Sequence, residues 1–72
     1  MAIEIFTARE LEDVIIRLKQ KLKKGEKAKL ILHDINLLSH VARLSMKYGL
    51  SFINAEELHE NKVIIEFENR FR

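Results

Sequence analysis

The spacing of apolar residues changes its period along this chain, and that change constrains the fold more than any other feature. In residues 2–6, Ile3 and Ile5 alternate with Glu4 and Phe6, which is typical of a β-strand. Over residues 8–24 the apolar side chains instead recur every three or four positions, which predicts an α-helix with one buried face. We therefore expect the fold to combine strands and helices in alternation.

The rest of the chain repeats these two periods. Residues 27–33 alternate and residues 37–48 have helical spacing. Residues 51–57 indicate a weaker strand, and residues 63–68 alternate again. The order is β-α-β-α-β-β, and right-handed crossovers place both helices on the same side of the sheet. We predict an α/β (α+β) two-layer sandwich, a four-stranded mixed sheet with two helices on one face, as a single domain over residues 1–72. Alternation within the strands fits a sheet whose second face is uncovered.

Local signals mark the ends of these elements. Thr7 and Glu10 have the spacing of a capping box at the start of the first helix. Asp34 or Asn36 can cap the second helix, and residues 59–61 predict a turn between the last two strands. Each of the chain's two glycines follows a helical stretch, where a positive φ is favoured. The residues expected between the layers are Leu11, Val14, Ile15, Leu18, Leu22, Leu37, Val41 and Leu44.

Several framework positions resemble the TusA/SirA-like family of small sulfur-carrier proteins. The resemblance spans the segments LKKGEKAKLILHD, KYGL and KVIIEFEN, and the matching residues are Leu22, Gly25, Leu30, Leu32, Asp34 and Gly49. It implies the two-layer fold described above, a layout that also occurs in the C-terminal domain of bacterial translation initiation factor three.

The functional signature of that family is missing from this chain. The family carries sulfur as a persulfide on the cysteine of a Cys-Pro-x-Pro motif at the start of the first helix. That cysteine would fall near Ala8, but residues 7–11 read Thr-Ala-Arg-Glu-Leu and the chain has no cysteine. The resemblance therefore implies a fold without the sulfur-transfer chemistry.

The composition excludes several classes of function. Without cysteine there is no disulfide framework, no thiol catalysis and no cysteine metal site. The longest apolar runs are three residues, so we expect no membrane span and no signal peptide. A composition rich in Lys, Glu, Ile and Leu is typical of thermophile proteins, and we expect a cytoplasmic location. Because the chain has no phosphate-binding loop or motif of hydrolases and metalloproteases, we predict a non-enzymatic protein without cofactor or metal.

The first candidate functional surface is the uncovered face of the sheet. If alternate strand residues point at the helices, then Phe6, Ile31 and Ile64 lie together on the other side. An apolar patch on an open face indicates a partner. We predict that this face is the main contact with a second copy of the chain or with another protein, as in a small adaptor domain.

The alternative is a surface that binds RNA or another polyanion. Seven of the chain's 13 lysines and arginines fall in residues 17–29, opposed only by Glu26. The candidate anion patch is Arg17, Lys19, Lys21, Lys23, Lys24 and Lys27. The same pattern is also typical of a solvated helix face whose bases suit the helix dipole.

An enzyme or a metal protein is the third interpretation. His33, Asp34 and His40 form the one close group of such residues. Asp34 lies where the second strand meets the second helix, an edge where α/β sheets often bind ligands, and His40 lies on that helix. The competing interpretation makes Asp34 a helix cap and both histidines surface residues.

Overall fold

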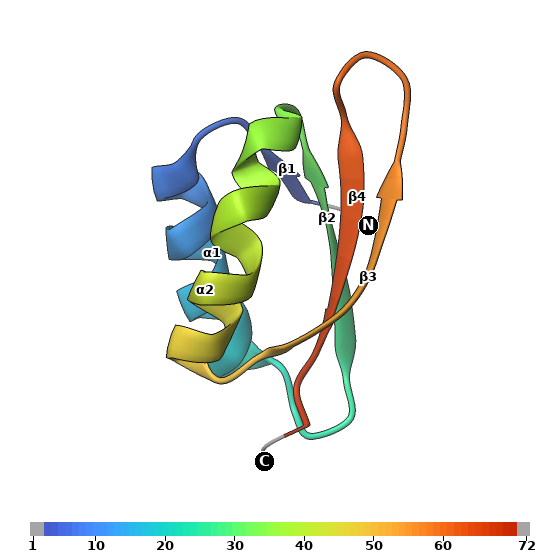
Figure 1. Ribbon diagram of the computed structural model, residues 1–72. Coiled ribbons are helices and arrows are strands. Elements are labelled where there is room, and N and C mark those ends of the chain that lie inside the picture. The colour runs from blue at the N-terminus through green and yellow to red at the C-terminus, as the bar shows by residue number, and fades with distance from the viewer. Residues whose placement is uncertain (1–2, 71–72) are drawn as a thin grey trace.

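The computed structural model describes residues 3–70 and confirms the predicted two layers. The chain runs β1 (Ile3–Ile5), α1 (Ala8–Lys21), β2 (Lys27–Leu32), a 3₁₀ turn η1 (Ile35–Leu37), α2 (Leu38–Tyr48), β3 (Ser51–Glu57) and β4 (Val63–Glu68). Both helices cover the same face of the sheet, as Figure 1 shows.

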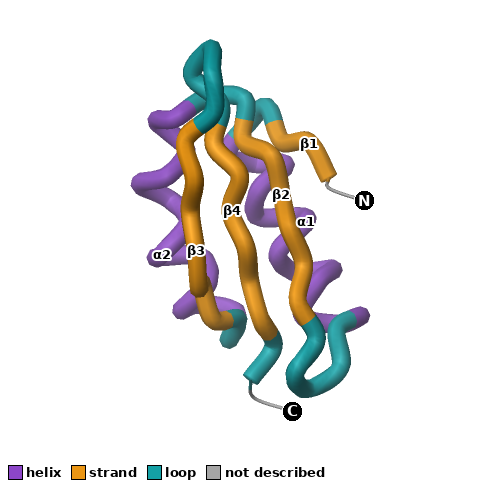
Figure 2. Tube along the Cα trace, turned by 90° about the vertical axis from the view of Figure 1, so that its right-hand side faces the viewer, coloured by secondary structure: helices purple, strands orange, loops and turns teal. Residues whose placement is uncertain are grey.

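The order of the strands is β1-β2-β4-β3. β1 pairs with β2 in parallel, whereas β4 runs antiparallel to both of its neighbours, β2 and β3. The last strand in sequence therefore lies inside the sheet, and β1 and β3 form its edges (Figure 2).

The core lies between the layers, as predicted. Of the eight residues expected there, seven are buried and Leu22 is partly exposed. The inward side chains of β4, Val63, Ile65 and Phe67, are fully buried because both flanking strands and the helices enclose them. Each such side chain contributes about 1.5–3 kcal/mol through burial, so the central strand anchors the fold.

The predicted end of the first helix at Lys24 is wrong. α1 ends at Lys21, and Leu22 already has an extended backbone with ψ 131°. The side-chain amide of Asn69 donates to the Leu22 carbonyl at 2.7 Å. The turn that follows is held to the end of β4, because the Gly25 amide donates to the Asn69 carbonyl at 2.6 Å. A contact from the far end of the chain thus ends the helix before its periodicity does.

Asn69 also joins the two helices. It is 1% exposed, and its Oδ1 accepts from the Lys19 ammonium at 3.2 Å. The same ammonium donates to the Gly49 carbonyl at 3.3 Å, where α2 ends. The C-terminal ends of both helices and the end of β4 are therefore connected through one buried amide and one half-buried cation.

The predicted caps are present. The Glu10 amide donates to Thr7 Oγ1 at 3.1 Å, and the Thr7 amide donates to Glu10 Oε1 at 3.1 Å. Asp34 accepts from the Asn36 amide at 2.9 Å, but it caps the 3₁₀ turn η1, so α2 begins one residue later than expected. Gly49 ends α2 with φ 81°, a left-handed conformation that glycine adopts without steric cost.

The predicted turn between β3 and β4 is also present. Glu60 and Asn61 have φ values of 63° and 66°, and the Lys62 amide donates back to the His59 carbonyl at 3.4 Å. Two successive positive φ values are the mark of a type I′ hairpin turn. Asn61 tolerates this conformation well, whereas Glu60 pays a steric cost for it.

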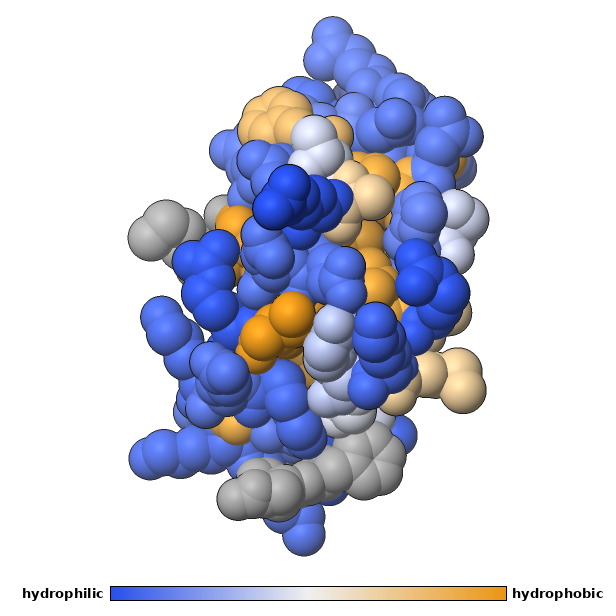
Figure 3. Space-filling view, turned by 90° about the vertical axis from the view of Figure 1, so that its left-hand side faces the viewer, coloured by the Kyte–Doolittle hydropathy of each residue, from blue (hydrophilic) through white to orange (hydrophobic). Residues whose placement is uncertain are grey.

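The outer surface of the helix layer is mostly hydrophilic (Figure 3). Glu12 of α1 makes polar contacts with α2: the Tyr48 hydroxyl donates to Glu12 Oε2 at 2.6 Å, and the Lys47 ammonium lies 3.7 Å from the same oxygen. This hydrogen bond holds the pKa of the Glu12 carboxyl below its ordinary value and raises the pKa of Tyr48. The helix layer is thus fastened by a contact that acid weakens.

Candidate functional site

The structure places all three residues of the predicted partner patch on the side of the sheet away from the helices, called here the open sheet face. Ile31 on β2 is directly opposite Ile64 on β4, and both are half-buried. Phe6 follows β1 and is 58% exposed. Its ring stacks on His33 with centroids 4.2 Å apart. Ile31 and Ile64 therefore form a direct pair, whereas Phe6 contacts His33, the residue that follows β2.

Charged side chains surround this isoleucine pair. By register, Glu4 lies beside Ile31 and Glu56 lies beside Ile64, which makes one row across all four strands. In the next row Lys29 is opposite Glu66. The open sheet face therefore has a small apolar centre with charges of both signs beside it.

The structure divides the predicted anion patch. Arg17 and Lys21 are exposed one helical turn apart on α1, and Lys23 and Lys24 are exposed in the turn that follows. Lys19 points elsewhere, toward Gly49 and Asn69. Lys27 is exposed at the start of β2, opposite Glu68 of β4. Within residues 3–70 none of Arg17, Lys21, Lys23 and Lys24 takes part in an ion pair.

The three residues of the predicted enzyme or metal group make separate contacts. His33 Nε2 lies 2.6 Å from Glu4 Oε1. His40 Nδ1 lies 3.0 Å from an Arg43 nitrogen, and Asp34 caps η1 as described above. Across residues 3–70 no three His, Asp or Glu side chains lie close enough to hold a metal ion. The geometry favours the cap and surface interpretation of these residues.

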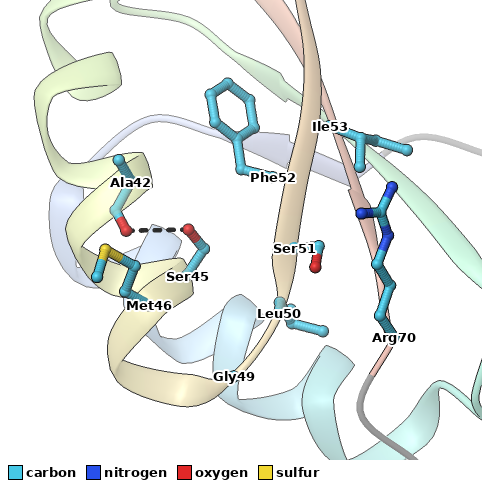
Figure 4. A pocket seen from close by; sticks show the side chains of 9 residues that line it. All are labelled: Ala42, Ser45, Met46, Gly49, Leu50, Ser51, Phe52, Ile53 and Arg70. Atoms are coloured by element: carbon cyan, nitrogen blue, oxygen red, sulfur yellow. Dashed lines mark hydrogen bonds between the residues drawn. The ribbon is translucent and has the colours of Figure 1, made fainter.

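A groove between α2 and the edge strand β3 was not predicted. It has a volume of about 660 Å³, and Figure 4 shows the side chains around it. Its lining residues are Ala42, Ser45, Met46, Gly49, Leu50, Ser51, Phe52, Ile53 and Arg70. Met46 is 83% exposed and Phe52 is 38% exposed, so large apolar side chains meet solvent on both walls. This groove is called the α2–β3 groove below.

Two features of β3 create this groove. The ladder between β3 and β4 shifts register between Phe52 and Asn54, a bulge that bends the strand. Figure 1 shows β3 diverging from α2 toward the hairpin. The sequence indicates this region only through the weak strand pattern of residues 51–57. The divergence of the strand from the helix has no local sequence signal.

A scan against models of protein families, a search of curated proteins and a search of solved structures each found no match for this chain. Within the described residues, neither helix is long and apolar enough to cross a lipid bilayer.

Proposed function

We propose that this chain is a small non-enzymatic binding domain, an adaptor that contacts a second copy of itself or another protein through the open sheet face. One observation carries the proposal: Ile31 and Ile64 pair at the centre of a face that no helix covers, with Phe6 exposed on the same face. Apolar side chains gathered on an otherwise polar face indicate a partner.

The expected strength of such a contact is modest. Fully burying one large apolar side chain contributes about 1.5–3 kcal/mol, so three contribute roughly 5–9 kcal/mol. Association costs an estimated 4–15 kcal/mol, and these side chains are already partly buried in the monomer. The charged residues beside the isoleucine pair then determine which partner fits, because Lys29 and Glu66 offer one charge of each sign.

The proposal includes a fold related to the TusA/SirA-like carriers and a cytoplasmic role without sulfur transfer. The position that resembles the family's cysteine is near Ala8, the first residue of α1, whose side chain packs against the core. A chain without any thiolate has no group there to hold a persulfide. Incubation with a cysteine desulfurase and a persulfide donor should leave its mass unchanged, and a gain of one sulfur atom would contradict this part of the proposal.

The test of the binding surface is a double charge substitution. Ile31→Glu with Ile64→Lys should leave the monomer folded, because both side chains point away from the core. Sedimentation of the wild type should show self-association that the double variant lacks. If the double variant associates as strongly as the wild type, the interface lies elsewhere. If the wild type is monomeric, the wild type and the double variant are compared for capture of a partner protein.

Binding of RNA or another polyanion is the second candidate function. Four exposed bases without ion pairs, Arg17, Lys21, Lys23 and Lys24, support it. Lys19 is engaged with the fold and Lys27 lies opposite Glu68, which shrinks the patch. Titration with single-stranded and duplex RNA at increasing salt tests it, since a phosphate contact gives an affinity that falls steeply with salt concentration.

A further inference from the structure

The α2–β3 groove is a second surface, separate from the open sheet face, and one of its walls is the backbone of an edge strand. In a β-strand every second residue directs its N–H and C=O away from the paired neighbour, so β3 presents such groups at the sheet edge. The other wall is helical and contributes Ala42 and Met46. Phe52 lies between the walls, with its ring tilted against Phe67. A cleft between a strand edge and an apolar helix fits an extended chain. The backbone of such a chain hydrogen-bonds to the strand edge, and its side chains contact the helix.

We propose that the α2–β3 groove binds one extended peptide segment of a partner protein, which pairs with β3 as a fifth strand and inserts an apolar side chain against Ala42, Met46 and Phe52. The volume of about 660 Å³ lies within the range of about 300–1,000 Å³ common for binding pockets.

The position of α2 favours a single strand over a second copy of this chain. Figure 2 shows α2 beside β3, on the side away from β4, and Figure 1 shows it in the helix layer. Pairing of β3 with β3 of a second copy would bring both α2 helices to the same place above the new sheet. A lone strand has no such helix, so it reaches the edge without a clash.

Charge determines the kind of segment. Arg70 is the one charged residue among those lining the groove, at the Ser51 end of β3. Its Nε pairs with Glu68 at 3.1 Å, and in Figure 4 its guanidinium points toward Ile53. At the other end of β3 lies the exposed carboxylate of Glu57, which the register places on the same face of the sheet as Phe52. A complementary segment has an acidic residue near Arg70, an apolar residue beside Phe52, and a basic residue near Glu57.

The probe for this site is a displayed library of random dodecapeptides, selected against the full 72-residue chain. Enriched peptides should contain the acidic, apolar and basic residues in that spatial order. Their binding should shift the amide signals of β3 and of the C-terminal half of α2 in NMR spectra. N-methylation of alternate peptide residues should abolish binding in one register and leave it nearly unchanged in the other, because only alternate residues pair with β3.

Two exposed positions supply matched variants. Met46→Glu and Arg70→Glu should each weaken binding at least tenfold, whereas the charge reversal Lys23→Glu, in the turn after α1, should not. A peptide whose acidic residue is replaced by lysine should bind Arg70→Glu better than it binds the wild type. Thermal melts confirm that each variant is folded.

Three results would overturn the inference. One is a library without enrichment, and another is a set of peptides that bind Met46→Glu as tightly as the wild type. The third is a set of peptides that shift amides of Ile31 and Ile64 instead of β3; in that case the proposed function through the open sheet face would stand while the groove would not.

Discussion

The side chain of Asn69 offers the sharpest test of how this fold is held together. In Asn69→Ala the Leu22 carbonyl loses its side-chain donor at 2.7 Å and the Lys19 ammonium loses an acceptor at 3.2 Å. A neutral hydrogen bond contributes about 0.5–1.5 kcal/mol and one to a charged group about 1.5–3 kcal/mol. The free energy of unfolding should therefore fall by about 2–4 kcal/mol. For a domain of this size that lowers Tm by roughly 10–30 °C.

The assay is chemical and thermal unfolding followed by circular dichroism. Asn69→Leu keeps most of the buried volume but removes both hydrogen bonds, so it separates polar contacts from packing. Asn54→Ala, at an exposed position of β3, is the control and should change stability by less than about 0.5 kcal/mol. Full stability of Asn69→Leu would refute the reasoning, because packing alone would then explain the buried amide.

The remaining predictions concern the core, the helix layer and the hairpin. Leu18→Ala should cost about 2–5 kcal/mol in urea unfolding, since Leu18 is 8% exposed, and a loss near zero would contradict its place between the layers. Glu12, with its lowered pKa, stabilises the fold above its unfolded pKa, and this contribution is lost as pH falls through the lower folded pKa. Tyr48→Phe should therefore lose less stability than the wild type on acidification below about pH 4.5, and equal losses would argue against the Tyr48 contact. Glu60→Asn should raise stability by about 0.5–1 kcal/mol, because asparagine tolerates positive φ, whereas Glu56→Asn in extended backbone should not.

Local signals in the sequence account for most of the fold. The capping box at Thr7, the hairpin turn at Glu60 and the alternation of residues 63–68 depend on neighbours within four positions, and all three predictions are confirmed. The end of α1 is different, since it depends on Asn69, 47 residues beyond Leu22. Strand order is equally non-local: alternation predicts that β4 exists, but nothing within its six residues specifies which strands flank it.

The candidate sites likewise differ in how far they depend on local sequence. Alternation predicts that Ile31 and Ile64 share a face, and the register confirms that they are direct partners. Whether that face binds a partner stays a prediction. Lys19 could not be separated from its basic neighbours by sequence, because its role depends on acceptors supplied by α2 and β4. The α2–β3 groove depends on a bulge and on the divergence of two elements, and neither has a local signature.

The central position of β4 has a consequence for synthesis on the ribosome. β2 and β3 are both made before β4, yet neither contacts the other in the finished sheet, since β4 lies between them. The nascent chain can form α1 and the short β1–β2 pair early, but β3 has no strand to pair with until residues 63–68 emerge. Most of the sheet then forms in one late step. The β3–β4 hairpin is local, but the pairing of β4 with β2 joins residues distant in sequence, which is the kind of contact that slows folding. Until then β3, with Phe52 and its exposed edge, is the segment most accessible to chaperones or to a neighbouring nascent chain.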